Sequence, residues 1–349
     1  MMDETTPGGS AFEFTGTWRE FAPIAFTNLL LTIVTLGIYR FWAKTRERRY
    51  LWSRTNFIDD PLEWTGTGKE LLIGFLIAVP LFGIPLIALQ ILVQSLMIRG
   101  EVAFANLLSL CSTLLLLYVV GLARFRALRY RLSRTYWHGI RGGSDERGYV
   151  YGWSFLWRTM VGGAVFGLLL PWAMTENWNM RWNSMTFGPQ NFTSGAEAGP
   201  VLRRLLLCYG IGIGGMILLA IVGSSISREM QPLFGIPALI VVFGTLAVLV
   251  ISYYAAFMRQ AIGNMTLNRI EFHFSARTWD VFKLLLGDLG LLIVTLGLGF
   301  VFIGYRHWSF LAYHLEASGE VTLSELTQST TDSPKQGEGL LDAFDVGAF

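Results

Sequence analysis

The stretch "LLTIVTLGIYRFWAKTRERRYLWSRTNF", residues 30–57, changes character at its middle. Its first half is apolar and contains Gly37, whereas aromatic and basic residues alternate in its second half. The basic residues are Arg40, Lys44, Arg46, Arg48, Arg49 and Arg54. Tyr and Trp are enriched where a membrane segment meets water, and Lys and Arg mark its cytoplasmic side. The stretch therefore predicts a boundary between a membrane segment and the cytoplasm.

The rest of the chain also has the composition of a membrane protein. Of its 349 residues 52% are hydrophobic and 15% are charged, compared with about 25% charged residues in soluble domains. The mean hydropathy is +0.46. Seven apolar segments approach the length of about 20 residues that crosses a bilayer. We therefore predict an all-α polytopic membrane protein with apolar segments at Ile24–Trp42, Leu71–Ile98, Val102–Ala123, Phe155–Met174, Val201–Ile226, Leu233–Phe257 and Val281–Ile303.

The sequence resembles itself at regular intervals. "IVTLG" occurs at 33–37 and again at 293–297. Midway between the two copies, Phe166-Gly167 occupies the position that corresponds to Leu36-Gly37. A second, shorter interval links "RYLWSRT" at 49–55 to "RYRLSRT" at 129–135. We therefore expect about 2.5 internal repeats of ~130 residues each. The expected boundaries are 1–140, 141–270 and a partial unit at 271–319, followed by a disordered acidic tail at 320–349.

Short junctions with a strand-like composition separate the apolar segments. "YLWSRTNFIDDPLEWTGT", residues 50–67, places Tyr, Trp, Thr and Phe on both sides of an Asp-Asp-Pro turn. These residues favour strands and turns, respectively. A hydroxyl residue followed three positions later by Glu is typical of a helix N-cap, and this pattern occurs at Thr17, Thr67 and Ser194. We expect small strand-like junctions on the cytoplasmic face, each followed by a capped helix.

Two membrane topologies fit the basic residues. If all seven segments cross in alternation, the basic loops are divided between the two sides, with an excess inside. If the first, fourth and seventh segments turn back, nearly all basic loop residues lie on the cytoplasmic side, as such residues prefer. Gly37, Gly167 and Gly297 permit a break there, but protein or water must then satisfy the broken backbone. The sequence leaves both topologies open.

Asn28, Arg158 and Asp288 occupy matching positions of the three units, near the start of equivalent apolar segments. Ionisable groups within membrane segments are costly and usually face partners or water. One hypothesis is an ion pair between Arg158 and Asp288, with Asn28 beside it, lining a polar path. The alternative is that each residue lies near the interface and extends its polar end into it.

The basic junctions predict contact with anionic lipid headgroups, which attract nearby basic residues by about 1 kcal/mol each. Membrane lipids are therefore the expected partners, and nucleic acid is not expected. The four His residues have no metal-ligand spacing, and "GIGIGG" at 210–215 lies inside an apolar segment. We predict no catalytic, metal or cofactor site and no enzymatic activity. The candidate lipid contacts are Arg40, Lys44, Arg46, Arg48, Arg49, Arg54, Arg124, Arg126, Arg129, Arg131 and Arg134.

Several strings resemble the YjgN-like family of bacterial inner-membrane proteins, a family of unknown function. They are "FEFTGTWREF", "TLGIYRFWAKTRERRYLW", "EWTGTGKELLIGF", "RYRLSRTYWHGIR" and the "LLDAFDV" tail. The resemblance spans nearly the whole chain and implies a multi-pass protein of the bacterial inner (plasma) membrane. The string "GLLLPWAMTENWNMRWNSMTFG" departs from the pattern because it has few basic residues. The resemblance implies no site residues.

Two functions follow from these features. Repeats, proline-interrupted segments and polar residues within them are typical of transporters, which favours transport of a small molecule or ion. The alternative is a non-transporting scaffold that binds anionic lipids or partner proteins through the basic junctions.

Overall fold

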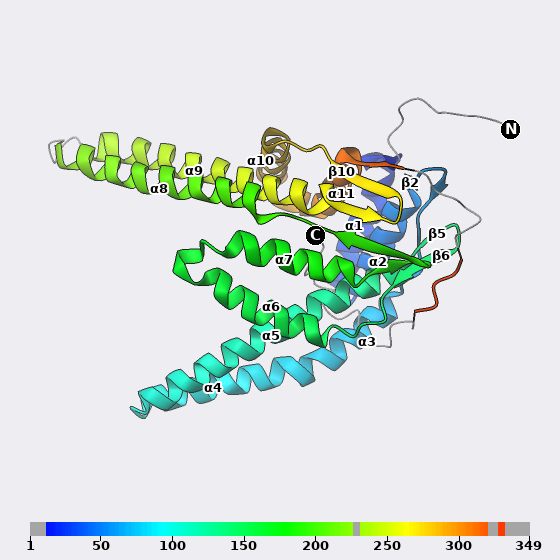
Figure 1. The fold of residues 1–349 in the computed structure, drawn as a ribbon, viewed down its shortest axis with the longest axis horizontal. Coiled ribbons are helices and arrows are strands. Elements are labelled where there is room, and N and C mark those ends of the chain that lie inside the picture. The colour runs from blue at the N-terminus through cyan, green and yellow to red at the C-terminus, as the bar shows by residue number, and fades with distance from the viewer. Residues whose placement is uncertain (1–11, 226–230, 320–326, 332–349) are drawn as a thin grey trace.

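The computed structural model describes residues 12–225, 231–319 and 327–331. The chain is mostly helical, and short strands connect the helices (Figure 1). Within the described residues, four helices are long and apolar enough to cross a membrane: Gly68–Ile98, Val102–Arg134, Ala198–Ser225 and Gly235–Gly263. The four helices therefore account for the second, third, fifth and sixth apolar segments.

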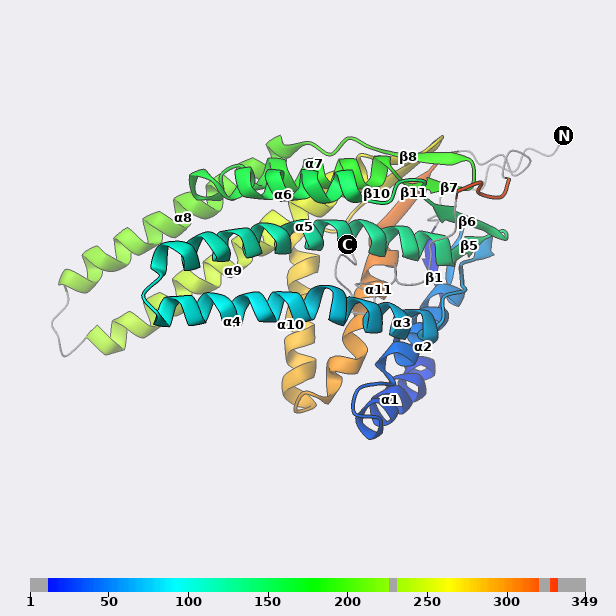
Figure 2. The same ribbon diagram turned by 90° about the horizontal axis from the view of Figure 1, so that it is seen from below.

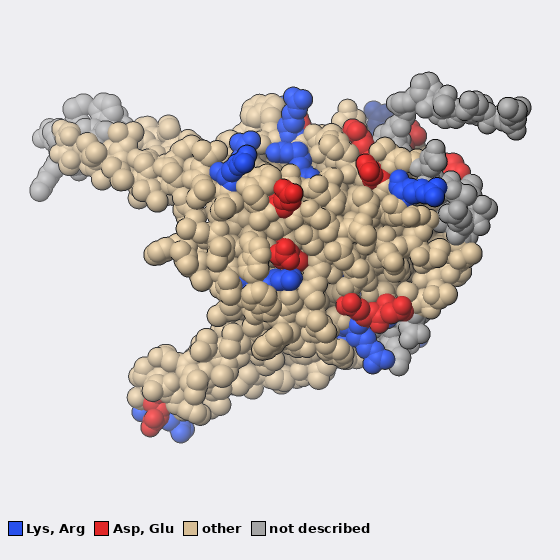
Figure 3. Space-filling view, viewed as in Figure 1, with Lys and Arg blue, Asp and Glu red and all other residues tan. Residues whose placement is uncertain are grey.

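The four long helices form two antiparallel pairs. The first pair contains α3 (Gly68–Ala78), a π-helical turn at Val79–Gly83, α4 (Ile84–Ile98) and α5 (Val102–Arg134). The second contains α8 (Ala198–Ser225) and α9 (Gln231–Gly263). The two pairs extend as arms to the left of Figure 1, and the charged residues of Figure 3 gather away from them, apart from a few at the tip of the lower arm. The arms thus present apolar surfaces of the kind that lipid covers.

The first, fourth and seventh apolar segments are hairpins of two shorter helices. The hairpins pair α1 (Trp18–Val34) with α2 (Arg40–Ser53), α6 (Tyr149–Gly163) with α7 (Leu170–Asn183), and α10 (Thr278–Val294) with α11 (Ile303–His314). Short 3₁₀ turns follow the breaks at Val165–Gly167 and Leu298–Phe302. Figure 2 shows that α10 and α11 run across the direction of α4 and α5. Each of these three segments therefore turns back on itself in the structure.

The breaks lie at the glycines expected from the sequence. Gly37 and Gly297 have φ angles of 90° and 91°, which glycine adopts without the steric cost that a Cβ imposes. The Thr35 hydroxyl accepts a hydrogen bond from the Tyr39 N–H at 2.9 Å, and Thr295 does the same for Gly299 at 2.7 Å. These hydroxyls satisfy donors that the broken helix leaves without a backbone partner.

The hairpin tips are apolar and exposed. Leu36 and Leu296 are each 94% exposed, and Phe166 is 91% exposed. Each of these residues also has a positive φ, between 51° and 55°, which is unusual for a residue with a side chain. Large exposed apolar groups on a strained turn indicate contact with lipid or another apolar surface.

The strand-like junctions form one continuous sheet, which the prediction of an all-α fold with small strand-like junctions did not include. The sheet is antiparallel, curves as a half-barrel and has the strand order β11-β10-β9-β8-β7-β6-β5-β4. A junction by itself leaves N–H and C=O groups unpaired at its edges, and pairing with the next junction satisfies them. The strands are β4 (Glu63–Trp64), β5 (Thr135–Trp137), β6 (Ile140–Gly143), β7 (Thr186–Phe187), β8 (Gln190–Ser194), β9 (Met265–Leu267), β10 (Ile270–Phe274) and β11 (Leu315–Ser318).

A second, three-stranded sheet has the strand order β1-β2-β3. Its strands are β1 (Phe12–Phe14), β2 (Thr55–Phe57) and β3 (Asp60–Pro61). The strand β1 also contacts β11, at the other end of the large sheet. One face is apolar: β10 alternates buried Ile270, Phe272 and Phe274 with exposed residues. The sheet therefore turns an apolar face towards the helices.

Two of the three predicted helix caps are confirmed. The hydroxyls of Thr17 and Thr67 accept hydrogen bonds from the backbone N–H groups of Glu20 and Glu70, at 3.4 and 3.3 Å. The prediction for Ser194 is wrong, because this residue lies in β8 and its hydroxyl donates to an Asn side chain. Ser194 pairs with Met265 of β9, and this strand pairing, which competes with the cap, determines the backbone conformation of Ser194.

Part of the chain after β11 also lies on the sheet. The Gln328 amide donates to the Gly139 carbonyl at 2.8 Å, and its oxygen accepts from the Arg141 N–H at 3.2 Å. The rest of the predicted acidic tail, including "LLDAFDV", lies outside the described residues.

Candidate functional site

A cavity of about 900 Å³ lies between the curved sheet and the helical hairpins. Its walls come from α1, α2, α7, α11, the end of α5, and strands of both sheets. Trp308 on α11 donates a hydrogen bond to the Thr55 hydroxyl at 2.9 Å, across 253 residues of sequence. The Tyr305 hydroxyl donates to the Gly16 carbonyl, also at 2.9 Å. The two ends of the chain thus build the cavity together.

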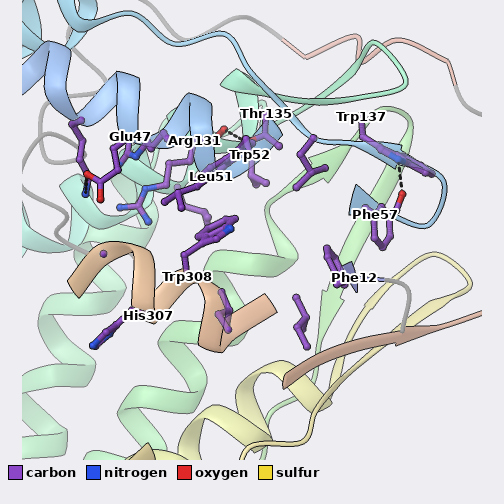
Figure 4. A pocket seen from close by; sticks show the side chains of 18 of the residues that line it. Phe12, Glu47, Leu51, Trp52, Phe57, Arg131, Thr135, Trp137, His307 and Trp308 are labelled. Carbon is purple, nitrogen blue, oxygen red and sulfur yellow. Dashed lines mark hydrogen bonds and ion pairs between the residues drawn. The ribbon is translucent and has the colours of Figure 1, made fainter. Parts of the chain in front are cut away.

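One end of the cavity is apolar and aromatic (Figure 4). Phe12, Phe57 and Trp137 gather there. The Phe12 and Phe57 rings stack with centroids 4.5 Å apart, and Phe57 meets Trp137 edge to face at 4.9 Å. The Trp137 indole donates to the Phe57 carbonyl at 2.9 Å, which satisfies its polar atom. This wall is suited to a hydrocarbon chain, because burying apolar surface is its main contribution to binding.

The other end of the cavity is charged. Figure 4 shows Glu47, Arg131 and His307 there, separated from the apolar end by Trp52 and Trp308, whose rings stack at 4.2 Å. Glu47 is the one carboxylate among the described residues that line the cavity, and it pairs with Lys44 at 3.6 Å. Five lining residues are Lys or Arg: Arg40, Lys44, Arg48, Arg131 and Arg181. Among the described residues, the lining therefore combines charged side chains at one end with an apolar wall at the other.

Four of the predicted lipid-contact residues line this cavity: Arg40, Lys44, Arg48 and Arg131. Others are engaged elsewhere: Arg54 pairs with Glu20 at 3.1 Å, and Arg134 with Glu70 at 2.9 Å. The remaining five differ in exposure. Arg46 and Arg49 are exposed on α2, Arg129 is buried, Arg124 lies over the Phe155 ring, and Arg126 lies over the Tyr149 ring and donates to the Arg147 carbonyl.

Asn28, Arg158 and Asp288 do not meet, and the predicted ion pair between Arg158 and Asp288 is not formed. Each residue instead bonds to the second helix of its own hairpin. Asn28 donates to the Ala43 carbonyl at 3.2 Å. Arg158 pairs with Glu176 at 3.5 Å, and Asp288 pairs with Arg306 at 2.6 Å and His307 at 2.7 Å. Each residue bonds within its own hairpin because the turn places the second helix next to the first. The three hairpins are separate elements, so the residues of different hairpins are farther apart.

The sequence predictions missed three charged or titratable residues of the cavity: Glu47, Arg181 and His307. A signal for one of them was present in the sequence. Arg181 occupies the position that Leu51 and Leu311 hold in the other two units, and both Leu side chains also line the cavity. A charge at a position that is otherwise Leu is a departure that the repeat comparison can detect.

Among the residues described, His307 lines the cavity and contacts Asp288. In that part of the chain, no group of three or more His, Cys, Asp or Glu side chains is placed to hold a metal ion. The Asp288–His307 contact orients an imidazole, but Arg306 shares the same carboxylate. The arrangement is a cavity with an apolar wall and a few polar and charged side chains, as is usual for small-molecule sites.

Comparison with known proteins places the chain in a family. The family described as a bacterial protein of unknown function (DUF898) matches residues 9–343. The chain belongs to this family. It is similar to the inner membrane protein YjgN of Salmonella typhimurium (strain LT2), with 24% identity over 366 residues that cover 90% of each chain. The resemblance to YjgN-like proteins is thus confirmed.

A second relative is the inner membrane protein YjgN of Escherichia coli (strain K12), with 28% identity over 141 residues. These residues cover 40% of this chain and 32% of that protein. No solved structure gives a significant match. The names of the relatives and the four apolar helices together support an inner-membrane location for this family member.

Proposed function

We propose that this chain is a multi-pass inner-membrane protein that binds a membrane lipid in the cavity between its sheet and its hairpins. The observation that carries the proposal is the two-ended cavity, with Phe12, Phe57 and Trp137 at one end and charged groups at the other. Its volume of about 900 Å³ lies within the range of about 300–1,000 Å³ that is usual for small-molecule sites. A lipid has the same division into a hydrocarbon part and a polar part.

In the proposed topology the two arms cross the bilayer and the three hairpins do not. Support comes from the basic residues, which gather at the sheet end of the molecule, because such residues prefer the cytoplasmic side. The turn between α4 and α5 carries only Arg99 as a basic residue. The sheet and the cavity then face the cytoplasm, next to the inner leaflet from which a lipid would come.

Thiol labelling tests this topology in a chain whose Cys111 and Cys208 are replaced by Ser. Asn191→Cys in β8 is expected to resist a membrane-impermeant reagent added to intact cells, and Glu101→Cys at the arm tip is expected to react. Both residues are exposed in the structure. Labelling of Asn191→Cys from outside would overturn the topology.

We also propose that the chain consists of two repeats and a third partial one, at 1–140, 141–270 and 271–319. Gly37, Gly167 and Gly297, at matching positions of the three units, all lie at hairpin breaks. Another set of matching positions lines the cavity, namely Arg48, Trp178 and Trp308. A common ancestor of the three hairpins would account for both features.

Transport remains the alternative function, and the kinked first arm favours it. The π-helical turn at Val79–Gly83 interrupts one long helix, and such turns often occur at functional sites. A scaffold that binds through a flat basic face is less well supported, because several of the candidate Arg side chains are buried or paired. In all three roles, lipids are the proposed partners and no catalysis is proposed.

Mass spectrometry of the intact detergent-extracted protein tests lipid binding directly. We expect one lipid molecule bound per chain after mild purification. Ala43→Phe, which fills the cavity, is expected to lower occupancy at least tenfold. Ala103→Phe, on the exposed start of α5, is the matched control and is expected to retain the lipid. Equal occupancy in the two variants would overturn the proposal.

Flux measurements in liposomes separate binding from transport. Lipid-binding protein that moves no labelled lipid or solute between compartments supports a binding role alone. Flux that Ala43→Phe abolishes would favour transport of the cavity ligand.

A further inference from the structure

Arg181, on α7, is a buried cation without a carboxylate partner in the part of the chain that the structure describes. Its side chain is 4% exposed and lines the cavity. Its Nε atom is buried without a hydrogen-bond acceptor, and no carboxylate of the described residues lies within 4.0 Å of its guanidinium. The Trp178 ring lies against it, with its centroid 5.2 Å from the guanidinium carbon.

The groups around Arg181 further disfavour the charged form of its guanidinium. Burial lowers the pKa of Arg181 to about 10, and the positive charges of Arg124 and Arg131 act in the same direction. The hydroxyl of Tyr151 acts against this shift but carries no charge at neutral pH. Glu47, a carboxylate that lines the cavity, pairs with Lys44 at 3.6 Å. Burial of an unpaired charge is costly, and proteins usually avoid it.

Two arginines on the hairpins, Arg158 and Arg306, show the usual arrangement, in which a carboxylate pairs with the guanidinium. Arg158 contacts Glu176 at 3.5 Å, and Arg306 contacts Asp288 at 2.6 Å. Arg181 differs from them although it lies deeper. A buried side chain that lacks its counter-charge and reaches a cavity is complementary to an anion that would enter that cavity.

The fold itself does not require a charge at this position. The residues at the matching positions of the other two hairpins are Leu51 and Leu311. Both line the same cavity, so an apolar side chain of similar reach satisfies the packing there. Arg181 therefore adds a property that the packing of the hairpin does not need.

We propose that Arg181 binds the phosphate or carboxylate group of the lipid that occupies the cavity. This inference rests on the proposed function and specifies the ligand class as an acidic amphiphile with a single hydrocarbon end. The planar guanidinium can donate two parallel hydrogen bonds to an oxyanion. The Trp178 ring lies against the guanidinium but supplies no hydrogen-bond acceptor to its N–H groups.

The test uses the full-length protein in a neutral detergent and two fluorescent probes with the same chain. One is dodecanoic acid labelled with nitrobenzoxadiazole, and the other is its methyl ester. We expect the wild-type protein to bind the acid at least tenfold more tightly than the ester. We expect Arg181→Leu to bind both probes with the wild-type affinity for the ester, and Arg181→Lys to keep part of the preference.

Arg49→Leu is the control, because Arg49 is exposed on α2 and does not line the cavity; it is expected to keep the wild-type ratio. Leu at position 181 copies what the chain has at Leu51 and Leu311, and thermal unfolding checks that the variant folds. An unchanged acid-to-ester ratio in Arg181→Leu overturns the inference.

Each remaining outcome separates this inference from the proposed function. Equal binding of acid and ester by the wild-type protein leaves lipid binding intact but overturns the anion site. Binding of neither probe overturns the proposed function. Displacement of the acid probe by millimolar inorganic phosphate, without any binding of the ester, identifies a site for free anions and overturns the assignment to a lipid.

Discussion

Replacing Arg181 with Leu should stabilise the lipid-free protein, although Arg181 is a binding residue in our proposal. The pKa of Arg181 is lowered from 12.5 to about 10, mainly by burial. One pKa unit corresponds to about 1.4 kcal/mol, so the charged form is disfavoured in the folded state by roughly 3 kcal/mol. The guanidinium is charged in both the folded and the unfolded state at pH 7, so this cost is fully present at neutral pH. The cost would fall only as the pH rises above about 10, where the folded protein loses the proton.

Two other terms change with the substitution. Loss of the contact with the Trp178 ring removes about 1 kcal/mol of favourable interaction. A Leu side chain restores apolar contact with the cavity wall, as Leu51 and Leu311 provide in the other hairpins. The expected net gain in the free energy of unfolding is about 2 kcal/mol, within the range of about 1–4 kcal/mol found when buried charges are replaced by apolar groups.

Thermal unfolding of delipidated protein, followed by tryptophan fluorescence, measures this effect. The midpoint should rise by several degrees, since 1 kcal/mol corresponds to about 2–4 °C in chains of somewhat smaller size. Arg158→Leu is the matched control and should lower the midpoint, because it leaves Glu176 without its partner. Addition of the acid probe should raise the midpoint of the wild-type protein more than that of Arg181→Leu, because the variant binds the acid more weakly. A fall of the midpoint in delipidated Arg181→Leu would refute the claim that Arg181 is an uncompensated charge.

Three further substitutions test the fold. Gly297→Ala should destabilise the last hairpin by about 1 kcal/mol, because Ala is disfavoured at a φ of 91°; Gly290→Ala, inside α10 with space around it, should be neutral or stabilising in the same unfolding assay. Asp288→Asn should lower stability by about 1–3 kcal/mol, because Arg306 loses its charged partner but stays partly in solvent; no change would mean that solvent already screens the pair. Thr67→Ala should cost about 1 kcal/mol through loss of the α3 cap, and hydrogen exchange confined to the first turn of α3 would show that the effect is local.

The helical elements could be predicted largely from the sequence, because their signals are local. Apolar length located the two arms, and the glycines at 37, 167 and 297 located the points at which the hairpins turn. The choice between crossing and turning back could not be made, because Gly is also common in straight membrane helices. The hydroxyl groups of Thr35 and Thr295, which satisfy the backbone at two of the breaks, are the feature that would have favoured a turn.

The sheet and the cavity depended on contacts between distant segments. Each junction has a strand-like composition, but pairing of β6 with β7 or β8 with β9 joins different junctions, and no local pattern specifies such partners. Four of the cavity cations were among the predicted lipid contacts, yet they were expected on a surface rather than around a cavity. Arg181 was missed because its meaning depends on which face of α7 is turned inwards.

The position of α11 has a consequence for the order in which the protein assembles. Trp308 donates a hydrogen bond to Thr55, Tyr305 donates one to Gly16, and β11 contacts β1. The N-terminal hairpin therefore lacks these neighbours until the last hairpin has been synthesised. Translation proceeds at about 5–20 residues per second, and the 253 residues between Thr55 and Trp308 therefore impose a delay of roughly 10–50 s. During that interval the apolar surfaces of α1 and β1 are exposed on a nascent chain whose arms are still entering the membrane. The N-terminal segment is thus a natural client for chaperones during synthesis, and truncation before α11 should expose it permanently.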